Sequence, residues 1–320
     1  MNSDKPTVLV LGATGFIGRN LVEYLISNNL AQVTAVDKQL PNCAYLSADE
    51  EKLFEQANFV QKNLVNPGRD LQFFFVFFVL RILFSLTFFP PFYSLYLQTT
   101  AAIATLWDDG KHYDYVINLA AETKYGHNDE VYKERVKHLS LSCAAEAVKH
   151  NIKRFIEVST AQVYEPTNKP KSESGALDPW TNIAKFKLEV EQGLKDISGL
   201  DYVVVRPAIV YGPGDKTGVG KFKYFLVTKG NVLNFFSITL GPRIICGAIY
   251  KHLEKPMKLL WNSDLKLNTV HVHDVVRALW HLTTHGEKGA VFNLADKNDT
   301  GWVQINLILP SLVLTPSLYL

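Results

Sequence analysis

A glycine-rich stretch near the N-terminus constrains the fold of this 320-residue chain more than any other feature. Residues 7–11 (TVLVL) form a short apolar run, the pattern of a buried parallel strand, and residues 16–26 have the apolar spacing of a helix. Gly12 and Gly15 stand between them, and Gly18 follows in the first turn of the predicted helix. Glycines in a strand-to-helix turn permit a tight bend and a close approach of the backbone to a bound group. The chain is therefore predicted to open with the first unit of an α/β sheet.

Strands and helices alternate along most of the remaining chain. Further strands are predicted at residues 32–36, 59–64, 113–121, 154–159 and 201–206, and helices at 129–150 and 183–197. This alternation favours the α/β class with a Rossmann-type doubly wound parallel sheet. We expect a domain built on this sheet over residues 1–205 and a smaller C-terminal region, interleaved with it, over residues 206–320.

An insertion at residues 69–98 interrupts this order, and its main part, 72–98, is nearly all apolar with Arg81 as its only charge. Its length would suffice to span a membrane. A single span is excluded if the strands on both sides belong to one sheet, because it would separate them across the bilayer. Two interpretations remain: a segment that dips into a membrane, or, as we favour, translated non-coding sequence, since pyrimidine-rich codons encode Phe, Leu, Ser and Pro. Residues 230–238 and the tail 301–320 raise the same suspicion more weakly.

Charge and cysteine content narrow the partners and the compartment. Lys plus Arg number 33 against 31 Asp plus Glu, a formal net charge of +2, so no basic excess favours nucleic acid binding. Cys43, Cys143 and Cys246 form no C-x-x-C pair, which favours buried thiols in a reducing compartment over disulfides or a metal site. The first six residues carry no apolar core of a secretory signal. We expect a cytoplasmic protein that contacts a membrane only if residues 72–98 are genuine.

The glycine turn and a later acidic residue together predict a dinucleotide site. A helix N-terminus offers free N–H groups and the positive end of the helix dipole to a pyrophosphate. The residues predicted to hold it are Gly12, Ala13, Thr14, Gly15, Phe16, Ile17 and Gly18. Asp37 follows the second predicted strand about twenty residues beyond the motif, where a carboxylate accepts hydrogen bonds from an adenosine ribose. Because that carboxylate would repel a 2′-phosphate, the sequence favours NAD over NADP, although Lys38 beside it weakens the preference.

Later motifs resemble those of the extended short-chain dehydrogenases/reductases, the NAD-dependent epimerase/dehydratase family. The similar stretches are residues 116–121 (VINLAA), 155–164 (FIEVSTAQVY), 206–214 (RPAIVYGPG) and 270–275 (VHVHDV). The resemblance implies NAD as cofactor, oxidoreductase-type hydride transfer, a nucleotide sugar or similar hydroxylated substrate, and a homodimer. It further implies that residues 1–205 are the NAD(P)-binding domain and residues 206–320 the substrate-binding region. It also implies that the following residues lie along the cofactor: Asn63, Leu64, Leu119, Ala120, Ala121, Lys185, Pro207 and Ala208.

The catalytic centre departs from the family pattern. The family uses a Tyr-x-x-x-Lys pair on one helix, together with a Ser or Thr, to move the proton of the substrate hydroxyl. By the resemblance, Thr160 would polarise the substrate oxygen and Lys185 would hold the nicotinamide ribose. Thr181, however, stands four residues before Lys185, where the family has its tyrosine. A threonine hydroxyl is too short and too weakly acidic to serve as the proton shuttle.

Two interpretations of this departure remain open. Another residue replaces the tyrosine, with Tyr125 and Tyr164 the nearest candidates by motif position, and of these Tyr164 is better explained as a packing residue at a strand end. Alternatively, the chain is a catalytically silent dinucleotide-binding module that senses redox state or serves as a scaffold.

Two histidine pairs have spacings that a metal site could use. His271 and His273 fall two apart on a predicted strand, and His281 and His285 have the spacing of a helical zinc pair but lack the intervening Glu. We interpret the first pair as part of a packed strand and the second as a solvated helix end. No metal site is predicted.

Overall fold

The computed structural model describes residues 5–65, 99, 102–165, 171–215, 266–296 and 300–301. The apolar insertion at 69–98, residues 230–238 and the tail beyond residue 301 lie outside the described residues, as does Cys246. The chain divides into unit 1 (Met1–Pro207 and His273–Leu294) and unit 2 (Ala208–Val272 and Ala295–Leu320). None of the helices that the structure describes combines the length and the apolar character needed to cross a bilayer.

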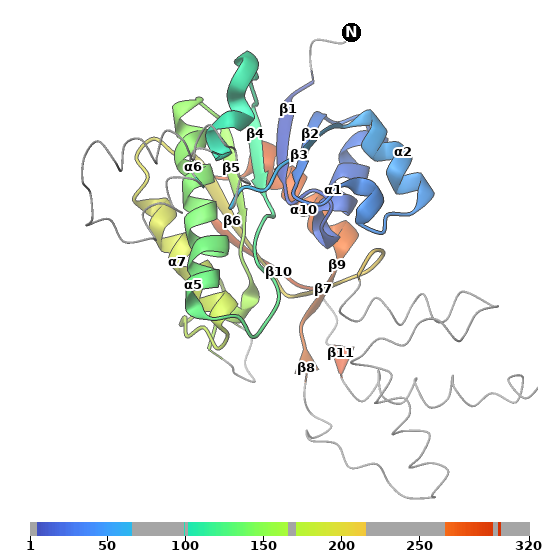
Figure 1. Cartoon of the computed structure of the whole chain (residues 1–320). Coiled ribbons are helices and arrows are strands. Elements are labelled where there is room, and N and C mark those ends of the chain that lie inside the picture. The colour runs from blue at the N-terminus through green and yellow to red at the C-terminus, as the bar shows by residue number, and fades with distance from the viewer. Residues whose placement is uncertain are drawn as a thin grey trace, which may run out of the picture. The chain divides into compact units, whose positions relative to one another are not determined.

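A parallel sheet forms the centre of unit 1 (Figure 1). In the described part of the chain it has seven strands in the order β10-β6-β5-β4-β1-β2-β3, and every neighbouring pair is parallel. The strands are β1 (Thr7–Leu11), β2 (Gln32–Asp37), β3 (Asn58–Gln61), β4 (Tyr115–Asn118), β5 (Arg154–Val158), β6 (Tyr202–Pro207) and β10 (Val291–Leu294). The central strands are buried on both faces, which explains their continuous apolar runs. The predicted doubly wound parallel sheet is confirmed.

The strand order reverses next to β1. β2 and β3 lie on one side of it, and β4, β5, β6 and β10 lie on the other. β1 and β4 pair in register from Val8 with Tyr115 to Leu11 with Asn118, so the loops that follow Leu11 and Asn118 start side by side. In open α/β sheets, ligands bind at the carboxyl ends of the strands where the order reverses.

Helices lie on both sides of the sheet (Figure 1). On one side are α1 (Phe16–Ser27), α2 (Ala48–Gln56) and α10 (Val272–His285). On the other are α7 (Asn182–Lys195) and a segment of α5 (Asp129–Tyr132), the π-helical η3 (Lys133–His138) and α6 (Leu139–Lys149). Tyr132, Val136 and Val190 from this second group pack on Leu9 and Phe155 of the sheet in one buried core.

Unit 2 contains two short pairs of strands. β7 (Ile209–Tyr211) runs parallel to β9 (Thr269–His271), and β8 (Lys266–Leu267) runs antiparallel to β11 (Thr300–Gly301).

The prediction that His271 and His273 share a strand was wrong. β9 ends at His271, and α10 begins at Val272. Val272, Val275, Val276 and Leu279 are all buried, and this helical spacing of apolar residues outweighs the strand preference of valine.

Candidate active site

The glycine turn after β1 is packed tightly against the loop after β4. Gly12 has a φ of +80°, and a Cβ added to it would lie 2.8 Å from the backbone nitrogen of Ala120. The backbone N–H groups of Gly12 and Ala13 donate to the carbonyl oxygen of Val36 at the end of β2, at 2.9 and 3.1 Å. A Cβ on Gly18 would lie 2.2 Å from the carbonyl oxygen of Gly12. The close packing of the turn therefore depends on glycine at both positions.

The N-terminus of α1 is open to a ligand. Its N-cap residue, Gly15, is exposed, no side chain caps the helix, and the first turn contains no acidic residue. The first N–H groups of a helix have no partner within the helix, and the helix dipole favours an anion there. This arrangement is suited to a pyrophosphate.

Asp37 lies directly against the glycine turn. Its Oδ2 accepts from the Thr14 N–H at 3.0 Å, and its Oδ1 accepts from the Gln39 N–H at 3.0 Å. The side chain is only partly buried, so its oxygens can accept further hydrogen bonds from a ribose. The structure thus brings together the turn and the carboxylate that the sequence predicted as partners.

Arg19 supports this site, although the sequence analysis missed it. The side chain is 3% exposed and donates to the carbonyl oxygens of Thr14 and Ala44, both at 2.9 Å. It therefore ties the loop after β2 to the glycine turn. Burial lowers the pKa of Arg19, while the charges of Glu50 and Asp37 act in the opposite direction. One feature of the sequence could have indicated Arg19: it directly follows Gly18, on the face of the first helix that carries the apolar residues.

The other predicted cofactor residues occupy varied positions. Leu119 donates its N–H to the Leu11 carbonyl at 2.9 Å, and the Ala120 N–H donates to Asn118 Oδ1 at 3.1 Å, which keeps this loop against the turn. Additional placements are as follows: Ala121 packs partly buried on the core, Asn63 Oδ1 accepts from the Val65 N–H, Leu64 is buried in the core, Pro207 is buried at the end of β6, and Ala208 is the first residue of unit 2.

Thr181 is the N-cap of α7, and its hydroxyl has two partners. Its Oγ1 accepts from the Ala184 N–H at 3.1 Å and donates to Gln162 Oε1 at 2.9 Å. Gln162 Nε2 in turn donates to the hydroxyl oxygen of Tyr125 at 3.0 Å. Tyr125 follows β4, Gln162 follows β5, and Thr181 precedes α7, so the carboxyl edge of the sheet gathers three distant segments. Gln162 was not predicted from the sequence, where it had no distinguishing pattern.

Lys185 and Thr160 border this group. Lys185 Nζ lies 3.4 Å from Asp129 Oδ2 and 5.3 Å from the ring centre of Phe186, and its side chain is half exposed. Thr160 Oγ1 accepts from the Gln162 N–H at 3.2 Å, so Thr160 and Gln162 belong to the same short turn. Lys185 is one turn along α7 from Thr181, as the predicted motif requires.

Tyr164 is placed as a packing residue by a buried polar network. Its ring is 9% exposed, its hydroxyl accepts from Arg206 at 2.6 Å, and it donates to Asn293 Oδ1 at 2.8 Å. Arg206 also pairs with the buried Glu191. Burial acts to lower the pKa of Arg206, but the hydrogen bond and charge of Glu191 outweigh it and raise that pKa. The Tyr164 hydroxyl thus both donates and accepts a hydrogen bond inside the protein.

A second buried network supports the strands beneath the site. Glu157 is fully buried and accepts from Lys187 at 2.8 Å and from Asn118 at 2.7 Å. Removing one partner of such a buried pair leaves an uncompensated charge, at a cost of about 3–5 kcal/mol. This network links the ends of β4 and β5 to α7. It therefore holds together the elements next to the candidate catalytic residues.

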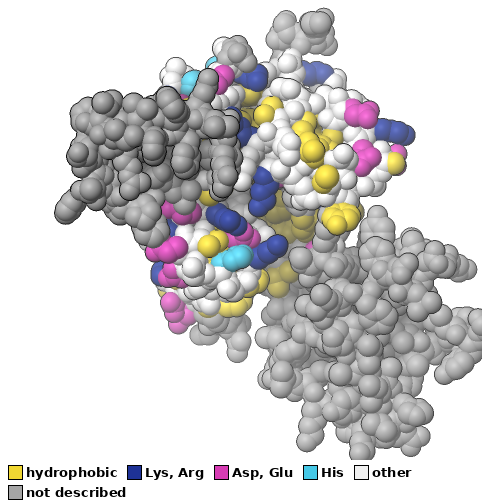
Figure 2. All heavy atoms as spheres, in the orientation of Figure 1, with side chains coloured by type: hydrophobic (Ala, Val, Ile, Leu, Met, Phe, Trp, Pro, Cys, Tyr) yellow, Lys and Arg dark blue, Asp and Glu magenta, His cyan; other side chains and the backbone are white. Residues whose placement is uncertain are grey.

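Figure 2 shows a hollow in the described part of unit 1, between the side that carries α1 and α2 and the side that carries α5–α7. Lys and Arg side chains lie at its edge together with Asp and Glu side chains, so charges of both signs border it.

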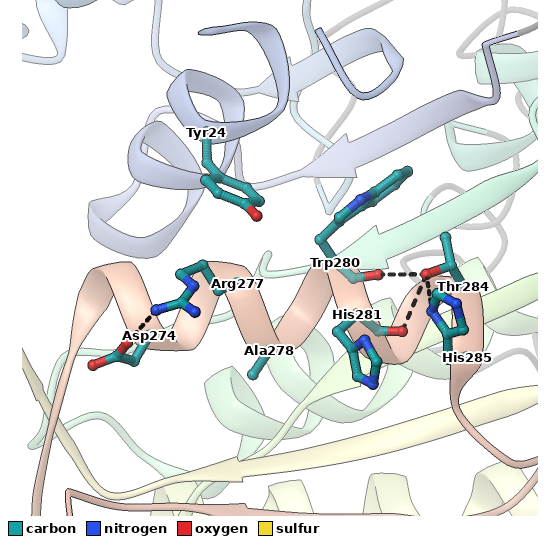
Figure 3. A pocket seen from close by; sticks show the side chains of 8 residues that line it. All are labelled: Tyr24, Asp274, Arg277, Ala278, Trp280, His281, Thr284 and His285. Atoms are coloured by element: carbon teal, nitrogen blue, oxygen red, sulfur yellow. Dashed lines mark hydrogen bonds and ion pairs between the residues drawn. The ribbon is translucent and has the colours of Figure 1, made fainter. Parts of the chain in front are cut away.

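A separate open pocket of about 520 Å³ lies between α1 and α10 (Figure 3). Tyr24 of α1 faces the helix, which contributes Arg277, Trp280, His281 and His285. The two histidine rings stack with centres 4.8 Å apart, and both are exposed. Among the described residues, no three metal-ligating side chains come together. This pocket contains none of the predicted site residues.

Comparisons with known proteins agree with the fold and the motifs. Residues 8–295 match the family model described as "NAD dependent epimerase/dehydratase family". The chain belongs to that family, and NAD is the cofactor of the family, as the sequence analysis predicted.

Individual relatives are more distant. A UDP-glucose 4-epimerase of Vibrio cholerae is 27% identical over 244 residues, which cover 74% of this chain and 61% of that protein. A UDP-glucuronic acid 4-epimerase of Bacillus cereus, solved in complex with NAD, has a TM-score of 0.65 at 18% identity, covering 96% of this chain and 84% of the other. A UDP-N-acetylglucosamine 4-epimerase of Methanobrevibacter ruminantium, solved with UDP-N-acetylmuramic acid, has a TM-score of 0.63 at 19% identity, covering 98% and 83%.

Proposed function

We propose that this chain is an NAD-dependent enzyme that transfers a hydride to and from a hydroxyl-bearing carbon of a nucleotide sugar, with Tyr125 in place of the missing catalytic tyrosine. The observation that carries this proposal is the hydrogen-bonded group of Tyr125, Gln162 and Thr181. It brings an exposed phenol to the residue that occupies the usual tyrosine position. The relatives that act on UDP-sugars support the substrate class.

Each residue of the site has a defined task in this proposal. NAD, when bound, would supply the hydride acceptor, with its pyrophosphate at the N-terminus of α1 and its adenosine ribose on Asp37. Thr160 would hydrogen-bond the sugar oxygen, and Lys185 would hold the nicotinamide ribose. Tyr125 would take the hydroxyl proton as the C–H hydride leaves and return it when the hydride returns. The loss of such a proton shuttle costs about 10²- to 10⁴-fold in rate.

The exposure of Tyr125 favours this role over the catalytically silent alternative. Its side chain is 66% exposed, and its hydroxyl is held by Gln162. Tyr164 has no free hydroxyl function, as described above. An exposed phenol at the carboxyl edge of the sheet, held by a hydrogen bond, is accessible to a substrate.

Three further features belong to the proposal. Residues 206–320 would cover the substrate, and the protein would act as a homodimer. Cys43 and Cys143 are free thiols, which supports a cytoplasmic location; the expected burial holds for Cys143 but was wrong for Cys43, which is exposed.

The test uses the full-length chain loaded with NAD. UDP-glucose, UDP-glucuronic acid and UDP-N-acetylglucosamine are added separately, and nicotinamide reduction at 340 nm and sugar products are followed. We expect turnover with at least one of them and a loss of about 10²-fold or more in Tyr125→Phe. Tyr24→Phe, which removes a hydroxyl on α1 outside the site, should retain the wild-type rate. NAD binding without any turnover would instead support the silent module.

A further inference from the structure

We infer that Gln162 is a positioning residue, and that a directional chain of hydrogen bonds from the N-terminus of α7 turns the hydroxyl proton of Tyr125 outward, toward the substrate. This inference rests on the proposed function of Tyr125. The chain runs from the Ala184 N–H to Thr181, from Thr181 to Gln162, and from Gln162 to Tyr125.

The first link leaves the Thr181 proton free for the second. A backbone N–H can only donate, so Thr181 Oγ1 is the acceptor in its 3.1 Å bond with Ala184. The single proton of the Thr181 hydroxyl is then available for Gln162 Oε1, 2.9 Å away. This bond fixes the amide of Gln162 with its oxygen toward Thr181.

The orientation of the amide fixes the third link. With Oε1 directed at Thr181, Nε2 faces Tyr125, and an amide nitrogen can only donate. Tyr125 Oη therefore accepts at 3.0 Å, whereas the reverse bond from Tyr125 to Oε1 would be longer, at 3.4 Å. Its own O–H is left to point away from Gln162, on the exposed side of the ring.

This series of hydrogen bonds gives Thr181 a function at the position where the family has tyrosine. Its hydroxyl caps α7 and orients the amide that holds the displaced phenol. Serine could do the same, because it has the same hydroxyl, whereas valine has the shape of threonine but no hydrogen-bonding group. The inference thus predicts that Thr181→Ser keeps the hydrogen bonds of this group and that Thr181→Val loses them.

The first readout does not depend on activity. In the NAD-bound full-length protein, the side-chain NH₂ signals of Gln162 are identified in ¹⁵N spectra as the pair missing from Gln162→Glu. We expect slow hydrogen exchange of these protons in the wild type and in Thr181→Ser, and exchange at least tenfold faster in Thr181→Val and Tyr125→Phe. Equal exchange rates in the wild type and Thr181→Val would overturn the inference.

The second readout is the rate of nicotinamide reduction with UDP-sugars as a function of pH. The ionised carboxylate that Gln162→Glu introduces can only accept, so it would turn the Tyr125 proton inward. We expect Gln162→Glu to lose at least tenfold at pH 8 and to regain rate only as the pH falls to about 4, where the carboxyl becomes protonated and can donate. Thr181→Ser should stay within threefold of the wild type.

If Tyr125→Phe is inactive but Gln162→Glu matches the wild type at pH 8, the inference is wrong and the proposed function stands. If the wild type turns over no sugar, the proposed function fails. The exchange measurement then still decides whether the hydrogen bonds from Thr181 through Gln162 to Tyr125 are present.

Discussion

Gly15 and Gly18 lie three residues apart in one turn, but their surroundings differ. A Cβ on Gly18 would lie 2.2 Å from the Gly12 carbonyl oxygen and 2.7 Å from that of Ala13, both of which are backbone atoms that cannot move aside. Gly15 is exposed, has an ordinary φ of −64°, and a Cβ on it would meet the Gly12 oxygen at 3.1 Å. Gly18 is therefore required for packing, whereas Gly15 leaves room above the turn for a ligand.

The two glycines should accordingly respond differently to alanine. We expect Gly18→Ala to lower the free energy of unfolding by about 1–3 kcal/mol, as overpacking does. Gly15→Ala should lower it by only about 0.5–1 kcal/mol, because alanine is a poorer N-cap than glycine but fits the ordinary φ of this position. Urea denaturation of the protein without cofactor measures both. Equal losses would show that the two positions are packed alike.

The sequence was sufficient to predict the glycine turn with Asp37, and it was insufficient for the proposed catalytic group. The turn and Asp37 belong to adjacent βα units, so their proximity follows from the sheet topology. Tyr125, Gln162 and Thr181 lie in three loops whose side-chain directions depend on packing, and the motif pattern only marked Tyr125 as a nearby candidate. Gln162 and Arg19 were missed because a polar side chain in a motif has no sequence signal for its hydrogen-bond partner.

The predicted helix over residues 129–150 is in fact three segments. Its ends agree with α5 and α6 to within one residue, but η3 interrupts it with a π-helical stretch. A π-helical turn adds a residue to the helical repeat without changing which residues are apolar, so the periodicity did not reveal it. Within η3, both carboxylate oxygens of Glu134 are buried without a hydrogen-bond partner in the described residues, and His138 Nδ1 lies 3.1 Å away.

Glu134 should make stability depend on pH. Burial raises the pKa of Glu134, Glu130 adds to the effect, and Lys133 opposes it; burial also lowers the pKa of His138. A carboxyl whose pKa is higher in the folded protein is most favourable to folding at low pH. The free energy of unfolding should therefore fall as the pH rises through the folded pKa. Glu134→Gln removes this cost and should raise Tm at pH 7 by about 2 °C.

The comparison is made by thermal unfolding between pH 4 and pH 8. The gain from Glu134→Gln should shrink toward pH 4, where the wild-type carboxyl is protonated. Glu189→Gln on α7, which breaks the partly exposed pair with Lys137, is the control and should change stability by less than about 1 kcal/mol. A lower Tm for Glu134→Gln at pH 7 would mean that the charged carboxylate stabilises the fold through His138.

The arrangement of the strands could be predicted as a class but not in full. The alternation of strands and helices, with continuous apolar runs, was enough for a doubly wound parallel sheet. The position of β10 beside β6 was not predicted, because residues 291–294 were not recognised as a strand. The site nevertheless depends on the sheet, because the reversal of strand order at β1 brings the glycine turn and the loop after β4 to the same edge.

The most direct test of the central claim, that this edge binds NAD through the glycine turn, is calorimetric titration of the full-length protein with NAD and NADP. The account predicts one NAD per chain, weaker binding of NADP because of Asp37, and a loss of at least tenfold in NAD affinity, about 1.4 kcal/mol, in Gly15→Ala. Unchanged NAD affinity in Gly15→Ala, or the absence of binding to the wild type, would contradict it.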